Sequence, residues 1–125
     1  MCDFISTALP QIEGKAVKAI ATLTRERTSA LPDIATADEQ GLTNFDAPGW
    51  YALVLPAATP EVIVQRLNKA MSEALDSPVV HDRLKGLGNI VALPPRRTPE
   101  YLATFIRSEI AKWAGPIRAS GTSLD

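Results

Sequence analysis

The 125-residue sequence has very little of the chemistry that metal sites and disulfides need, because it contains one cysteine, Cys2, and one histidine, His81. A lone cysteine cannot form an internal disulfide, and one cysteine with one histidine is too few ligands for a structural zinc site. A catalytic histidine needs a nucleophile or an orienting acid close in space, and nothing in the sequence brings Cys2 to His81. We therefore interpret His81 as a surface residue and predict no metal site.

Charge of one sign and long apolar runs are also missing. The 13 basic and 14 acidic residues leave a net charge of −1, which gives no support to a nucleic-acid partner. No apolar run approaches the roughly 20 residues that cross a bilayer. The first residues lack the basic and apolar regions of a secretory signal peptide. Taken as written, the sequence predicts a cytoplasmic chain.

The usual patterns of enzymes and cofactor sites are not found either. Glu100 and Glu109 are nine positions apart, about two and a half helical turns, whereas paired catalytic carboxyls lie about 5–9 Å apart. The Gly86-Leu87-Gly88 stretch lacks the third glycine of a dinucleotide-binding loop and does not lie between a strand and a helix. The sequence therefore predicts no cofactor and no enzyme activity.

Two tripeptides, Thr59-Pro60-Glu61 and Thr98-Pro99-Glu100, are the clearest helix starts in the sequence. Each places threonine at the N-cap, proline at the first helical position and glutamate near the positive end of the helix dipole. Apolar residues then recur at helical spacing, which predicts one buried face on each helix. These residues are Ile63, Leu67, Ala70, Met71 and Ala74 in the first helix, and Leu102, Phe105, Ile106, Ile110, Trp113 and Ile117 in the second.

The remaining segments complete a predicted α/β fold. Short helices are expected over 4–13 and from Ser77, and strands over 16–24, 50–55 and 89–93, where apolar residues dominate. Thr36 and Glu39 have the spacing of a capping box, which predicts a short helix over 36–40. Pro116 is expected to kink or end the last turn of its helix.

Several segments, in this order, resemble the solute-binding receptors of tripartite tricarboxylate transporters, the Bug family. Each motif is weak alone, but their order and spacing across nearly the whole chain are specific. Ala35, Ala58 and Pro116 depart from the family pattern. The matching segments are 8–15 (ALPQIEGK), 18–21 (KAIA) with Arg25 and Arg27, 31–36 (LPDIAT) with 39–41 (EQG), 50–53 (WYAL) with 56–60 (PAATP), 66–68 (RLN), 84–88 (LKGLG), 98–100 (TPE), and 109–113 (EIAKW) with Gly121.

The resemblance implies the C-terminal portion of a two-lobed periplasmic-binding-protein-like fold. Residues 1–28 would end the second lobe, 29–49 would cross over, and 50–125 would return to the first lobe with two long helices. Such receptors are periplasmic, bind small carboxylates and deliver them to membrane subunits of the transporter. The family's glycine-rich ligand loops have no counterpart here, so only weak candidates for a cleft wall remain, by position: Phe45, Asp46, Trp50 and Tyr51.

Two hypotheses follow from these observations. The first is a truncated receptor with weak or no independent ligand binding, whose exposed apolar surface favours homo-oligomers. The second is a small self-associating interaction or scaffold module derived from the same fold. Trp50 and Tyr51 can line a cleft or belong to a core, and we consider core packing the better interpretation for Trp50.

Overall fold

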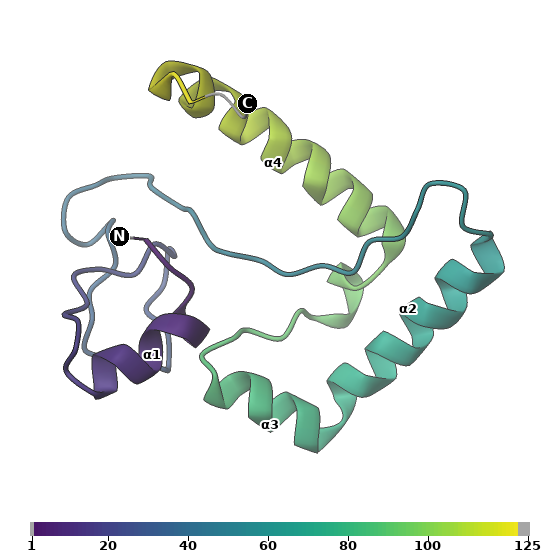
Figure 1. The fold of residues 1–125 in the computed structure, drawn as a ribbon, viewed down its shortest axis with the longest axis horizontal. Coiled ribbons are helices and arrows are strands. Elements are labelled where there is room, and N and C mark those ends of the chain that lie inside the picture. The colour runs from purple at the N-terminus through teal and green to yellow at the C-terminus, as the bar shows by residue number, and fades with distance from the viewer. Residues whose placement is uncertain (1, 123–125) are drawn as a thin grey trace. The chain divides into compact units, whose positions relative to one another are not determined.

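The computed structural model describes residues 2–122, and Figure 1 shows the order of their helices. The chain forms two compact units. One comprises the residues up to Leu53 with Ala74–Val91, and the other comprises Val54–Glu73 with the residues from Ala92 onward. Met1 and the last three residues of the predicted return segment lie outside the described residues. The helices are α1 (Ile5–Glu13), α2 (Glu61–Asp76), α3 (Pro78–Gly86), the short 3-10 helix η1 (Pro94–Arg96) and α4 (Pro99–Ser120).

The helix starts were predicted to within about a residue. At the start of α4, the Thr98 side chain accepts a hydrogen bond from the Tyr101 N–H at 3.1 Å, and Pro99 is the first helical residue. α2 begins at Glu61, one residue later than predicted. Pro116 was expected to kink or end the last turn of α4, and it does not end it, because the helix continues to Ser120. Proline removes its own N–H donor, and here that loss does not stop the helix. No helix in the described part of the chain is both long and apolar enough to span a membrane.

The three predicted strands do not form. Within residues 2–122 the backbone makes one isolated parallel bridge, between Thr22 and Thr36, and no strand. The segments 50–55 and 89–93 are irregular (Figure 1). A strand exists only when a neighbouring strand accepts and donates its backbone hydrogen bonds, and the described residues supply no such neighbour. The apolar composition of these segments was real, but it could not reveal that the partners are missing.

The predicted buried faces of the long helices are not buried either. On α2, Leu67 is 38% and Met71 43% exposed, and on α4 Ile110 is 66% exposed. Among the described residues Ala37 is the one buried apolar residue, and it is 6% exposed. Helical spacing makes a face amphipathic, but a second layer has to cover that face before it leaves water.

Arg97 connects α2 to the segment before α4 in the second unit. Its Nε donates to the Ala92 carbonyl at 2.7 Å and its Nη1 donates to the Ser72 carbonyl at 3.3 Å. The Asn68 side-chain amide in turn donates to the Arg97 carbonyl. One side chain therefore satisfies the carbonyls of Ser72 and Ala92, which are 20 positions apart in the sequence.

We expect Arg97→Ala to destabilise this unit by about 1–2 kcal/mol, because hydrogen bonds from a charged donor to carbonyls are lost. Urea unfolding followed by circular dichroism measures the change. The neighbouring Arg96→Ala is the matched control, since the Arg96 side chain makes no such bond within residues 2–122. Equal stability of the two variants would contradict this role for Arg97.

Candidate functional site

Phe45 and Asp46, two of the predicted cleft residues, lie in a segment that is tied to residues 23–25. Asp46 Oδ2 lies 3.5 Å from Arg25 Nε, and the Ala47 N–H donates to the Leu23 carbonyl at 2.8 Å. Both Phe45 and Asp46 are half-buried. The Asp46 carboxylate therefore already faces a cation, and by its own charge it repels an anionic ligand.

Trp50 and Tyr51 lie beside an aromatic contact with the N-terminal residues. The Tyr51 ring stacks on Phe4 with centroids 4.9 Å apart, and its hydroxyl lies 3.4 Å from Ser6 Oγ. Gly49 permits this approach, because a Cβ there would lie 2.0 Å from Phe4 Cε1. Trp50 is 41% and Tyr51 68% exposed, so neither is a core residue in this chain. The expected core packing of Trp50 is thus not found.

The four candidates consequently have different partners, with Asp46 paired to Arg25 and Tyr51 to Phe4. The sequence did not single out Arg25 or Phe4 as partners, because both contacts join residues more than 20 positions apart. Aromatic rings and a neutralised carboxylate can form a wall of a site. They do not supply the converging N–H donors or free cations that grip a carboxylate.

A cluster of polar side chains surrounds the Thr22–Thr36 bridge and fixes the backbone of the residues between them. The Thr36 N–H donates to Glu39 Oε2 at 2.7 Å, and the Glu39 N–H donates to Thr36 Oγ1 at 3.1 Å. The predicted capping box is therefore present, although residues 36–40 form turns and not the predicted helix. Thr22, Thr28 and Thr36 are buried here, and the Thr22 hydroxyl has no hydrogen-bond partner within the described residues.

Arg27 completes this cluster. Its Nε donates to both carboxylate oxygens of Glu39, at 3.1 and 2.9 Å, and its Nη1 donates to the Pro32 carbonyl. The hydrogen bond from Arg27, followed by the one from the Thr36 backbone, lowers the pKa of the Glu39 carboxyl. The carboxylate in turn raises the pKa of Arg27. The pair restrains residues 27–39 and leaves no spare charge for a ligand.

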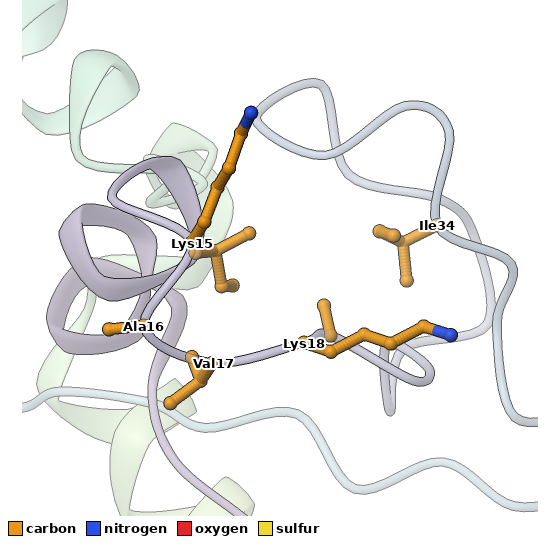
Figure 2. Close-up of a pocket in the computed structure, with 7 residues that line it drawn as sticks. Lys15, Ala16, Val17, Lys18 and Ile34 are labelled. Carbon is orange, nitrogen blue, oxygen red and sulfur yellow. The ribbon is translucent and has the colours of Figure 1, made fainter.

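A depression of about 600 Å³ lies after the end of α1 and opens to solvent (Figure 2). Two lysines, Lys15 and Lys18, border it. Its apolar lining comes from Ile34 across the loop and from residues at and after the helix end: Ile12, Ala16, Val17 and Ala19. Sequence reasoning missed this site, because 16–24 was expected to be a strand and lysines in a strand carry no functional signal of their own.

Neither a metal site nor a catalytic partner for His81 is seen among the described residues. Residues 2–122 contain no group of three or more His, Cys, Asp or Glu side chains placed to hold a metal ion. His81 Nδ1 lies 3.7 Å from the carboxylate of its neighbour Asp82, and the histidine side chain is 40% exposed. Its position on the surface of α3 agrees with the interpretation from sequence.

The chain matches a known family model and several known proteins. Residues 1–122 match the model of the family described as "Tripartite tricarboxylate transporter family receptor". The chain is 34% identical over 120 residues to the "UPF0065 protein in the TAR-I ttuE-ttuC' intergenic region" of Agrobacterium vitis. This alignment covers 96% of this chain and 35% of that protein. It is also 34% identical over 116 residues to BugT of Bordetella pertussis, covering 93% of this chain and 35% of BugT.

Two solved structures are similar in fold. MatC from Rhodopseudomonas palustris with bound malate is 42% identical, with a TM-score of 0.86, over 90% of this chain and 38% of MatC. The periplasmic binding protein BugD is 32% identical, with a TM-score of 0.83, over 91% of this chain and 38% of BugD. The chain thus spans about a third of the length of these curated relatives.

The lowered pKa of Glu39 predicts a specific pH dependence. In the unfolded chain the carboxyl titrates near 4.5, and in the folded chain it titrates lower. Its contribution to stability is therefore complete above about pH 4.5 and is lost as the pH falls through the folded-state value. Thermal melts between pH 3 and 6 measure this. The fall in Tm as the pH is lowered should be smaller in Glu39→Gln than in the unsubstituted chain. Glu26→Gln, an equal charge change nearby, should keep the full loss.

The close approach of Gly49 to Phe4 predicts that Gly49→Ala displaces the Phe4 ring from Tyr51. Loss of an aromatic pair is expected to cost about 0.5–1.5 kcal/mol. Urea unfolding followed by tyrosine and tryptophan fluorescence measures it. Gly86→Ala is the control, because a Cβ at Gly86 meets nothing within 4 Å. A Gly49→Ala variant as stable as Gly86→Ala would rule out this tight contact.

Proposed function

Because the chain belongs to the tripartite tricarboxylate transporter receptor family, we propose that it is a structural part of a small-carboxylate receptor and binds little or no ligand by itself. The family is one of receptors and not of enzymes. The predicted fold class, the C-terminal portion of a two-lobed periplasmic-binding-protein-like fold, is confirmed by the similarity to MatC and BugD. The missing strands do not contradict it, since strands need partners that the described residues do not contain.

One observation carries the proposal. The chain matches 38% of MatC with a TM-score of 0.86. Among its described residues, however, one apolar residue is buried. The chain has the backbone of part of a larger receptor, but its apolar helix faces are exposed to water. This combination supports the proposal that the rest of such a receptor covers these faces. We infer that the remaining part covers α2 and α4 and supplies strands beside 16–24, 50–55 and 89–93.

Ligand and partners are proposed from the same relationship. MatC was solved with malate, so a small di- or tricarboxylate is the ligand class we propose for the complete receptor. The membrane subunits of a tripartite transporter are its proposed partners, and the periplasm is its proposed location. We also propose that 1–28 ends the second lobe, that 29–49 crosses over, and that 50–125 returns to the first lobe.

Weak binding by this chain follows from the contacts of its candidate cleft residues. The Arg25 side chain next to them is neutralised by Asp46, and the Tyr51 hydroxyl points to Ser6. A carboxylate would therefore meet a wall that lacks an available cation. Phe45, Asp46, Trp50 and Tyr51 remain our proposed wall residues, with the gripping groups supplied elsewhere in the receptor.

Isothermal titration of the chain with malate, citrate, succinate and glutamate tests this proposal. We expect no saturable heat with any of the four, because the gripping donors are absent from the described residues. MatC titrated with malate is the positive control. Micromolar binding of any of these ligands by the chain would overturn the proposal.

The alternative function, a self-associating module, is favoured by the exposed apolar face of α2. Ile63 and Met71 are 42% and 43% exposed on the side of α2 predicted to be buried. A module would form a discrete dimer that Ile63→Glu breaks and Gln65→Glu does not. A receptor part would instead associate without a defined stoichiometry. Light scattering after size-exclusion chromatography distinguishes the two, and a stable monomer would contradict both.

A further inference from the structure

We propose that Asp38 is a positioning residue for the candidate cleft wall, because it fixes the segment that carries Phe45 and Asp46. The proposal rests on the proposed function, since the wall acts on a ligand only in a complete receptor. Asp38 is an exposed residue of the turn at 37–41. It acts through Asn44, the residue immediately before Phe45.

The Asp38 carboxylate holds a backbone group next to the wall. Its Oδ1 accepts a hydrogen bond from the Asn44 N–H at 2.7 Å, at the short end of the range for charge-assisted bonds. The two residues are six positions apart, whereas an aspartate that forms only a local turn bonds to the backbone two residues ahead. The bond therefore joins two parts of a loop. Bonds to a charged acceptor are also about twice as strong as bonds to a neutral one.

Asn44 sets the direction of the wall residues that follow it. Its φ is +60°, in the left-handed region, which asparagine enters more readily than most residues but does not prefer. The chain turns at this point, and the Phe45 N–H donates to the Leu42 carbonyl at 3.3 Å. Without the Asp38 carboxylate, Asn44 is released to leave the left-handed region, and Phe45 and Asp46 turn with it.

The loop from 37 to 47 is anchored at both of its ends. The Ala37 N–H donates to the Thr22 carbonyl, and the Ala47 N–H donates to the Leu23 carbonyl, each at 2.8 Å. These bonds fix where the loop begins and ends. Its path between the two anchors depends on internal contacts, and the carboxylate bond of Asp38 links its first half to its second half.

Two other charged contacts near the wall do not replace Asp38. The ion pair of Asp46 with Arg25 spans 3.5 Å between side chains that are 32% and 77% exposed, and exposed ion pairs contribute little to stability. Glu39, which is adjacent to Asp38, bonds to Arg27 and to a backbone N–H at the start of the loop. The neighbouring carboxylates therefore have different roles, because Glu39 closes the start of the loop and Asp38 holds its second half.

The backbone effect is tested in the ¹⁵N-labelled chain itself, by the scalar coupling between the amide and α protons of Asn44, which reports φ. Asp38→Ala should change this coupling and move the amide resonances of 44–47. Asp38→Asn, which keeps an oxygen that accepts the bond, should preserve both. Asp33→Ala is the matched control, because the Asp33 carboxylate makes no hydrogen bond within residues 2–122. An unchanged Asn44 coupling in Asp38→Ala would overturn the proposal.

The effect on ligand binding is tested in a complete receptor, in which the full chain replaces the 38% of MatC that it matches. In isothermal titration with malate, Asp38→Ala should weaken binding about fivefold or more, and Asp38→Asn should stay within about twofold of the unsubstituted receptor. Arg97→Ala, which is expected to destabilise the other unit, should leave the affinity unchanged and so separates positioning from general stability.

The outcomes distinguish this proposal from the proposed function. No loss of affinity in Asp38→Ala, or an equal loss in Arg97→Ala, would overturn the positioning role. Failure of the unsubstituted receptor to bind malate would instead contradict the proposed function, and the Asn44 coupling in the chain would still decide whether Asp38 fixes the segment.

Discussion

Apolar side chains leave water only where a second layer covers them, and the described part of this chain supplies very little of that layer. α2 has no buried residue, and on α4 Ile110 and Ile117 are more than half exposed. The segments with strand-like composition likewise lack neighbours for their backbone groups. Both facts have the same cause, since a helix face and a strand edge each need a surface from elsewhere. The chain matches 38% of MatC, and under the proposed function the rest of the receptor would supply that surface.

Local polar contacts, and not a hydrophobic core, define the conformation that remains. Arg27, Glu39 and Thr36 form a closed set of hydrogen bonds around one turn. Arg97 satisfies carbonyls of two segments in the other unit, and Phe4 stacks on Tyr51. Exposed contacts of this kind contribute modestly to stability. Each of them fixes the local backbone around the residues that it joins.

The contacts of the candidate cleft residues support the proposed role of the chain as part of a receptor. Near the predicted cleft wall, Arg25 and Asp46 neutralise each other. Ligand grip in a receptor needs charges or N–H groups that converge on empty space.

The sequence by itself determined the features that depend on residues three or four positions apart. The cap at Thr98, the capping box of Thr36 and Glu39 and the existence of α1 to α4 follow from such local spacing, and so does the family resemblance. Only the tertiary structure decided burial, strand formation and the pairs Arg25–Asp46 and Phe4–Tyr51. It also assigned the left-handed backbone to Lys15 and not to Gly14. These properties depend on residues far apart in sequence, or on a covering surface that the described residues do not contain. The spacing of amino acids in the sequence does not show whether such a partner is present.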